Sequence, residues 1–117
     1  MLPMLRLAPK PRIVNLASGG GSLTPNADPT WEYRSHFGIV YAVSKTAMNA
    51  VTLAFAIELA SANIKVNSAS PGFTATALNN FAGIETVEEG ARNPLRVILD
   101  EDGPSGTFSG PDGALPW

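Results

Sequence analysis

The part of the chain that most constrains its fold is residues 39–62, which contain neither glycine nor proline and are rich in alanine, with Leu53 and Leu59 among them. This composition favours a helix, because such residues have high helix propensity and nothing in the segment breaks the backbone pattern. Apolar residues also recur at helical spacing along one stripe. The stripe consists of Val43, Ala47, Val51, Ala54 and Ile57. We therefore predict one long helix over residues 39–62.

Short apolar runs flank the predicted helix and have the composition of strands. Residues 12–17 have the sequence RIVNLA, which is apolar and β-branched, and they lead into the turn-forming sequence SGGGSLTPNADP. Residues 64–70 have the sequence IKVNSAS, which begins with alternating apolar and polar side chains and stops at Pro71-Gly72. We predict a strand in each run.

A second helix and a last strand follow. Residues 86–100 predict a helix with Thr86 as its N-cap and with Glu88 and Glu89 in the first turn, where negative charge is favourable. Pro94 should kink or interrupt this helix. Residues 106–110 (GTFSG) predict the last strand.

Strands and helices therefore alternate as βαβαβ, which predicts an α/β fold with a parallel sheet and right-handed crossovers. A sheet of so few parallel strands is a poor isolated structure, so we expect half of a doubly wound domain. Its first strand should have an exposed edge. Apolar surface near Ile13, Leu16, Val43 and Val51 should then be partly uncovered and favour association, which makes a homo-oligomer an expected partner state.

Composition and charge exclude several classes of function. The chain has 117 residues, 44% of them apolar and 15% charged, with a net charge of −2 and no cluster of basic residues. Nucleic acid or an anionic membrane is therefore not expected as a partner. With no cysteine and a single histidine, His36, no metal site is expected. No apolar run approaches a membrane span, and the residues around Pro3 do not resemble a signal peptide, so the cytoplasm is the expected location.

Polar residues gather where the strands of this sheet would end. In open parallel sheets, ligands bind outside the carboxyl ends of the strands. Ser18 ends the first strand, and Pro71 begins the segment after the second. Tyr41 and Lys45, near the start of the long helix, are four residues apart and share one helix face. A nearby ammonium favours the phenolate, which suits a tyrosine to proton transfer.

Each of these features also has a simpler explanation. Tyr41 and Lys45 fit an ordinary helix surface with a half-buried ring, and Ser18 fits a loop cap. Pro71-Gly72 fits a plain turn. The functional interpretation depends on the order and placement of the three sets together.

The quoted residues resemble the short-chain dehydrogenase/reductase family. NLAS at residues 15–18 is similar to the family's strand that ends in its catalytic serine, and YAVSK at residues 41–45 matches its Tyr-x-x-x-Lys motif. VNSASPGFTAT at residues 66–76 is similar to its strand followed by Pro-Gly and threonine. The closing DGPSGTFSGPDGALPW resembles carbonyl-reductase-like members.

The resemblance implies roles for these residues. Ser18 would bind and polarise a substrate carbonyl, Tyr41 would pass the proton, and Lys45 would assist Tyr41 and hold the ribose of the nicotinamide. The cofactor would be NADP or NAD, and the substrate a small carbonyl or alcohol. The cofactor-binding residues implied by the resemblance are Tyr41, Lys45, Pro71, Gly72, Phe73, Thr74 and Thr76.

The sequence also departs from the family pattern. The family's glycine-rich dinucleotide loop and its Asn-Asn-Ala-Gly segment are missing, and so is its catalytic asparagine, unless residues 1–5 are the last turn of that helix. Gly19, Gly20 and Gly21 lack the G-x-G-x-x-G spacing and are not expected to open a helix, so we interpret them as flexibility in a substrate loop. Residues 1–117 are thus predicted to be the C-terminal, catalytic half of a Rossmann-type NAD(P)-binding domain.

The loop between Ser18 and Tyr41 carries Trp31, Tyr33, His36 and Phe37. It could cover a hydrophobic substrate, or it could pack on its own aromatic rings; His36 is expected to be solvated. For the whole chain, the alternative to an oxidoreductase is a non-catalytic fragment with a binding or structural role. A weaker alternative is the related epimerase/dehydratase branch, which uses the same tyrosine and lysine.

Overall fold

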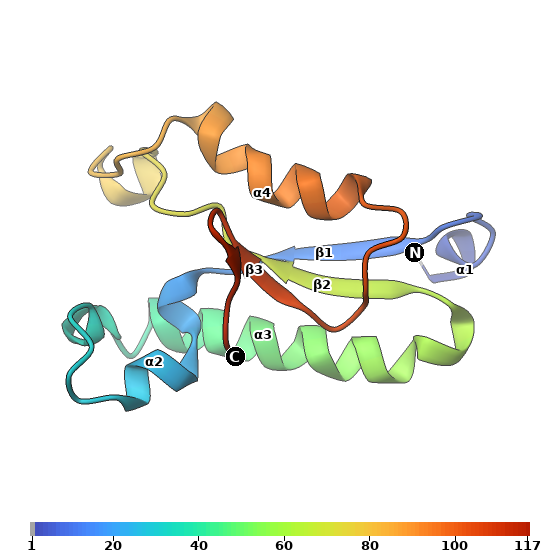
Figure 1. The fold of residues 1–117 in the computed structure, drawn as a ribbon, viewed down its shortest axis with the longest axis horizontal. Coiled ribbons are helices and arrows are strands. Elements are labelled where there is room, and N and C mark those ends of the chain that lie inside the picture. Colours follow the sequence, from blue (N-terminus) through green and yellow to red (C-terminus); the bar gives the residue numbers. More distant parts are fainter. Residues whose placement is uncertain (1) are drawn as a thin grey trace.

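The computed structural model describes residues 2–117 and contains one four-stranded sheet between two long helices (Figure 1). The strands are β1 (Arg12–Leu16), β2 (Lys65–Ala69), β3 (Phe108–Gly110) and β4 (Gly113–Ala114), in that spatial order. β1 pairs with β2 and β2 with β3 in parallel, while β4 is antiparallel to β3. The predicted α/β architecture is confirmed. β4, a short hairpin partner of β3, was not predicted.

The long helix α3 (Tyr41–Glu58) covers one face of the sheet and α4 (Val87–Leu99) covers the other (Figure 1). A further helical turn at Ala60–Ala62 continues α3, and Asn63 ends it with a left-handed φ of 54°. The remaining helical turns are α1 (Leu2–Leu5), α2 (Leu23–Ala27) and three 3₁₀ turns, at Gly19–Gly21, Arg34–His36 and Ala77–Asn79.

The face of α3 that packs on the sheet differs from the apolar stripe that predicted the helix. Its buried residues are Ala42, Asn49, Thr52 and Ala56. Val43, Val51 and Ile57 of the stripe are 44%, 46% and 71% exposed. Because α3 carries apolar side chains on most of its circumference, helical spacing alone does not identify the packed face.

A buried threonine connects α3 to both long strands. Thr52 accepts a hydrogen bond from the Asn15 side chain of β1 at 2.8 Å and one from the Ser68 hydroxyl of β2 at 2.9 Å. Such bonds satisfy polar groups that would otherwise be costly to bury, and they fix the helix above the sheet.

The predicted start of α4 is confirmed. Thr86 accepts a hydrogen bond from the Glu89 backbone, and the Glu89 carboxylate accepts one from the Thr86 backbone, which forms a capping box. These bonds to Thr86 lower the pKa of Glu89. The interruption expected at Pro94 does not occur. Asn93, Pro94 and Val97 are buried, so packing on the sheet holds the helix together across the lost backbone hydrogen bond.

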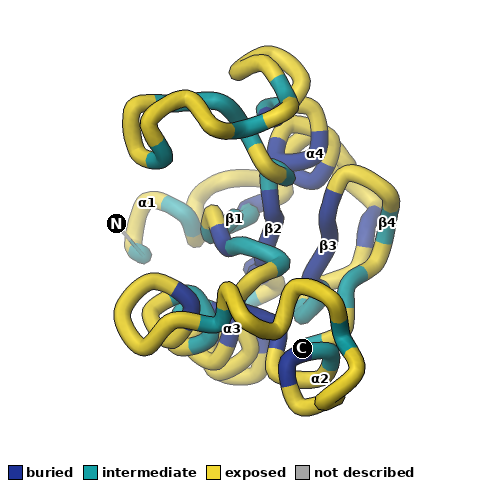
Figure 2. Tube along the Cα trace, turned by 90° about the vertical axis from the view of Figure 1, so that its left-hand side faces the viewer, coloured by how far each residue is buried: buried dark blue, intermediate teal, exposed yellow. Residues whose placement is uncertain are grey.

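β1 forms the open edge of the sheet, as predicted. Among the described residues it pairs with β2 alone. Figure 2 shows β2 mostly buried and β1 only partly so. Leu16 at its end is 56% exposed, so the predicted uncovered apolar surface near Leu16, Val43 and Val51 is also confirmed. No helix within residues 2–117 has both the length and the apolar character that a membrane crossing would need.

Candidate functional site

Ser18 lies where β1 ends and is the N-cap of the Gly19–Gly21 turn. Its hydroxyl oxygen accepts a hydrogen bond from the Gly20 backbone at 3.2 Å. The capping role that was the simpler explanation of Ser18 is therefore observed. The same position at the carboxyl edge of the sheet leaves the hydroxyl hydrogen free to turn toward a ligand.

Lys45 connects the end of β1 with Tyr41. Its ammonium donates a hydrogen bond to the Leu16 carbonyl at 2.8 Å and lies 5.8 Å from the centre of the Tyr41 ring. Tyr41 is the first residue of α3 and is 49% exposed. The predicted placement of both side chains on one helix face is thus present, with the phenol open to solvent.

The glycine turn after Ser18 packs directly on α3. A Cβ on Gly21 would lie 2.7 Å from the Lys45 Cβ, which is too close for any side chain. The Thr46 hydroxyl donates to the Gly21 carbonyl at 2.7 Å and holds the turn against the helix. Our interpretation of these glycines as loop flexibility, not opening a helix, is therefore wrong. They form a 3₁₀ turn that leads into α2, and Gly21 is needed for close approach.

The segment after β2 turns at Gly72, which has a φ of 89°. A Cβ there would overlap the Glu85 carboxylate, so this position favours glycine for two reasons. A backbone bridge joins the two segments, with the Ala75 amide donating to the Glu85 carbonyl at 2.8 Å. Glu85 could not be predicted from the sequence, because a single acidic residue in a loop carries no spacing signal.

The two threonines predicted to bind cofactor have different surroundings. Thr74 packs on Gly90 of α4, and its hydroxyl is buried without a hydrogen-bond partner among the described residues. Thr76 precedes the 3₁₀ turn at Ala77–Asn79, and its amide donates to the Asn79 side chain at 3.2 Å. The side chain of Phe73 is 53% exposed beside them.

The loop of residues 28–40 packs on its own aromatic rings. Trp31 meets Tyr33 edge to face at 5.8 Å between ring centres, and Tyr33 lies 6.4 Å from His36. His36 is exposed, as expected. These contacts favour the surface-packing alternative, although this loop and the loop before α4 lie at the same end of the molecule (Figure 1).

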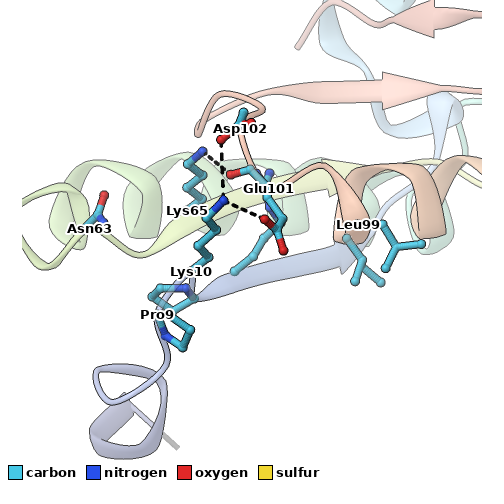
Figure 3. Close-up of a pocket in the computed structure, with 10 residues that line it drawn as sticks. Pro9, Lys10, Asn63, Lys65, Leu99, Glu101 and Asp102 are labelled. Atoms are coloured by element: carbon cyan, nitrogen blue, oxygen red, sulfur yellow. Dashed lines mark hydrogen bonds and ion pairs between the residues drawn. The ribbon is translucent and has the colours of Figure 1, made fainter.

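A hollow of about 400 Å³ lies at the amino ends of β1 and β2, opposite the carboxyl ends that carry the candidate site (Figure 3). Its cationic side chains all make hydrogen bonds within the chain. The Lys10 ammonium contacts the Glu101 carboxylate at 2.6 Å, and Lys65 donates to the Glu101 carbonyl at 2.9 Å. Arg12 donates to carbonyls of the loop after α4, including that of Gly103 at 3.1 Å. Because these groups satisfy one another, we do not assign a functional site there.

Comparisons with known proteins support the family and the fold. A family model described as enoyl-(acyl carrier protein) reductase matches residues 4–100. The chain is 31% identical to salutaridine reductase from Papaver bracteatum, over 92% of this chain and 45% of that protein. The solved structure of salutaridine reductase from Papaver somniferum has a TM-score of 0.74 at 30% identity, covering 92% of this chain and 47% of that one.

A carbonyl reductase structure from chicken fatty liver shares the fold, with a TM-score of 0.80 at 24% identity over 99% of this chain and 48% of that one. Fold and motifs together define half of a doubly wound, Rossmann-type α/β sheet with polar groups at its carboxyl edge. The chain belongs to the short-chain dehydrogenase/reductase family. It spans about half the length of the curated relatives that it matches.

Proposed function

We propose that this chain is the catalytic half of an NAD(P)-dependent oxidoreductase that transfers hydride between a nicotinamide cofactor and a small carbonyl or alcohol. The proposal depends on one observation. The Lys45 ammonium donates a hydrogen bond to the Leu16 carbonyl at the end of β1 and lies 5.8 Å from the centre of the exposed Tyr41 ring. Because Ser18 follows β1 by two residues, a serine hydroxyl, a phenol and an ammonium belong to one edge of the sheet.

The proposed roles follow from the chemistry of these groups. The Ser18 hydroxyl donates to the carbonyl oxygen and orients it, and the Tyr41 phenol supplies the proton that this oxygen needs as it becomes an alcohol. The Lys45 ammonium favours a negative charge on the Tyr41 oxygen when that proton leaves. In the reverse direction, Tyr41 accepts the proton of the alcohol.

The residues present fit the nicotinamide end of a cofactor. Lys45 has three N–H donors and uses one on Leu16, so the others remain for ribose hydroxyls. Gly72, at positive φ, offers backbone without a side chain, and the exposed Phe73 offers an apolar surface. Thr76, with the backbone around Pro71 to Phe73, is the proposed partner of the carboxamide, and Thr74 is a further proposed cofactor-binding residue. When bound, the cofactor supplies or takes up the hydride.

The alternative is a non-catalytic fragment. One observation favours it: the Gly19–Gly21 turn packs on α3 and cannot serve as a phosphate-binding loop. A dinucleotide site without the phosphate-binding helix terminus loses much of its affinity. We therefore expect residues 1–117 alone to bind NADPH weakly or undetectably. Calorimetric titration tests this, and micromolar affinity would reveal a phosphate site elsewhere in the chain.

Activity is tested in a fusion, called the joined protein, in which the N-terminal half of salutaridine reductase is followed by this chain. Steady-state reduction of a panel of aldehydes and ketones, with NADPH and with NADH, should show turnover that the N-terminal half alone lacks. Turnover by neither cofactor in a folded joined protein would favour the non-catalytic alternative. A cytoplasmic location remains part of the same proposal.

We also propose that the uncovered apolar surface promotes self-association. Val43, Val51 and Ile57 present one exposed stripe on α3. Large exposed apolar patches mark interaction surfaces. Sedimentation should show association of the wild type that Val51→Glu weakens, because a carboxylate at this exposed position disturbs only an interface. A monodisperse, cooperatively melting wild-type monomer would contradict this proposal.

A further inference from the structure

One buried hydroxyl lies between the two loops that carry the candidate site. Ser70 follows β2 and is 4% exposed. Its hydroxyl oxygen accepts one hydrogen bond from the Gly19 amide at 3.2 Å and another from the Gly72 amide at 3.3 Å. A serine oxygen has two acceptor sites, so both are in use.

The two amides belong to different parts of the site. Gly19 follows Ser18 directly, and Gly72 forms the turn after Pro71. Among the described residues, the Ser70 hydroxyl makes the one hydrogen bond that joins the Gly19–Gly21 turn to the segment after β2. The strands beneath are joined separately, through the Ala17 amide and the Ala69 carbonyl at 3.0 Å.

Asn93 of α4 fixes the backbone of Ser70 by a hydrogen bond. Its side-chain nitrogen donates to the Ser70 carbonyl at 2.9 Å and to the Ser109 carbonyl at 3.1 Å. Asn93 is 4% exposed. Because its nitrogen faces two carbonyls, the orientation of the amide is determined by its partners.

The other end of the Asn93 amide is equally occupied. Its oxygen accepts from the Arg96 guanidinium at 2.6 Å and from the Ser109 hydroxyl at 3.3 Å. A charged donor to the amide oxygen strengthens the hydrogen bonds that the amide nitrogen donates, because hydrogen bonds in a chain polarise one another. All four hydrogen-bonding positions of this buried amide are therefore used.

We propose that Ser70 is a positioning residue, supported by Asn93, which fixes the Ser18 loop relative to the Pro71-Gly72 turn. The consequence for the reaction rests on the proposed function. A carbonyl oriented by Ser18 must meet a nicotinamide held beside Gly72, and displacement of one by about 1 Å is enough to slow such a reaction strongly. A buried oxygen that binds both loops keeps this spacing constant.

The test is amide hydrogen exchange measured by NMR on the 117-residue chain. Ser70→Ala removes one oxygen atom, so the fold should be retained. We expect exchange of both the Gly19 and the Gly72 amides to accelerate by at least about fivefold, the effect of losing one hydrogen bond. Slow amides of β2, such as Val66, should keep their rates.

Ser105→Ala is the matched control, because the Ser105 hydroxyl accepts from the Val66 amide at 2.9 Å near the other end of β2. It should accelerate Val66 and leave Gly19 and Gly72 unchanged. Unchanged exchange at Gly19 and Gly72 in Ser70→Ala, or uniform acceleration of every slow amide, would overturn the proposal.

Asn93→Ala provides a second variant. It should accelerate the same two amides while Ser70 itself is intact, since the support of the Ser70 carbonyl is lost. If only amides of α4 exchange faster in Asn93→Ala, Asn93 does not support Ser70 and that part of the proposal is wrong. The exchange test needs no cofactor, so its failure is distinct from failure of the proposed function. In an active joined protein, Ser70→Ala should lower kcat with an unchanged pH profile, whereas Ser105→Ala should not.

Discussion

The amino and carboxyl edges of the sheet, where its strands begin and end, carry polar side chains in different situations. At the amino edge, Lys10 and Lys65 donate to the carboxylate and the carbonyl of Glu101 (Figure 3). Arg12 donates to the Asp100 carbonyl at the end of α4. At the carboxyl edge, Tyr41 is half exposed, and buried oxygen atoms of Thr74 and Glu85 lack partners among the described residues. Polar groups that satisfy one another hold a structure together. Groups that face solvent or remain unpaired are available for a ligand.

A hollow is therefore a weaker indication of function than unsatisfied polar groups. The amino-edge hollow is charged, but those charges already fix the loop after α4 to the starts of β1 and β2. Substitutions at the carboxyl edge should therefore change the reaction, and matched substitutions at the amino edge should change stability.

The largest effect is expected for Tyr41→Phe in the joined protein. The ring and its packing remain, but the proton donor is lost, so kcat should fall by roughly two to four powers of ten. Tyr33→Phe is the control, since the Tyr33 ring packs on Trp31 and His36 of its own loop. The measurement is steady-state carbonyl reduction. Near wild-type turnover in Tyr41→Phe would show that Tyr41 is not the proton donor and that Tyr41 and Lys45 are ordinary residues of a helix surface.

Lys45→Ala should come next and should affect two quantities. Turnover should fall because the ammonium beside Tyr41 is lost, and the KM for the cofactor should rise because the ribose donors are lost. Lys65→Ala removes a comparable lysine-to-carbonyl bond at the amino edge, and it should leave both constants unchanged. If the two variants behave alike in the kinetic assay, the contrast between the edges is wrong.

Ser18→Ala should lower turnover less than Tyr41→Phe, because orientation of the carbonyl oxygen is lost but the proton donor stays. Its capping bond to Gly20 is also lost, so a small fall in the thermal midpoint should accompany the kinetic change. Ser105→Ala, which loses a hydroxyl-to-amide bond at the amino edge, should change the midpoint alone. A turnover loss greater than that of Tyr41→Phe would give Ser18 a larger role than orientation.

The smallest effect concerns the Lys10–Glu101 pair at the amino edge. Its hydrogen bond and charge lower the pKa of Glu101 from 4.5 and raise that of Lys10 from 10.5. The stabilisation by Glu101 is therefore complete above pH 4.5 and is lost as the pH falls through its lowered pKa. The contribution of Lys10 is complete below pH 10.5 and is lost as the pH rises through its raised pKa.

Thermal midpoints of the wild type and Glu101→Gln should accordingly differ slightly near neutral pH and converge in acid. The difference should be small, because both side chains are largely exposed, and high salt should reduce it further. A difference that is independent of both pH and salt would show that the ion pair is not its source.

Local signals explain what the sequence could predict. The Thr86 cap, the strand runs and the spacing of Tyr41 and Lys45 each depend on a few neighbouring residues, and the structure bears out their placement. The family resemblance extended these local signals to a doubly wound sheet. Their roles in a reaction remain proposals.

Tertiary contacts explain what the sequence did not reveal. The Glu85 carboxylate lies against Gly72, and the Asn93 side chain donates to carbonyls at the ends of β2 and β3. These partners are too far apart in the sequence for a local pattern to predict them. The packed face of α3 was ambiguous because most of its circumference is apolar. Gly21 looked mobile in the sequence because glycine permits mobility and close contact alike.

The contact at Gly21 has a mechanical consequence. Backbone lies directly against backbone there, since the nearest atoms to its missing side chain include the Lys45 carbonyl carbon and the Thr46 nitrogen. No flexible side chain lies between the turn and α3 to absorb displacement. The end of β1 and the first turns of α3 should therefore shift together as one body, and an added methyl group at this point would act as a wedge between them.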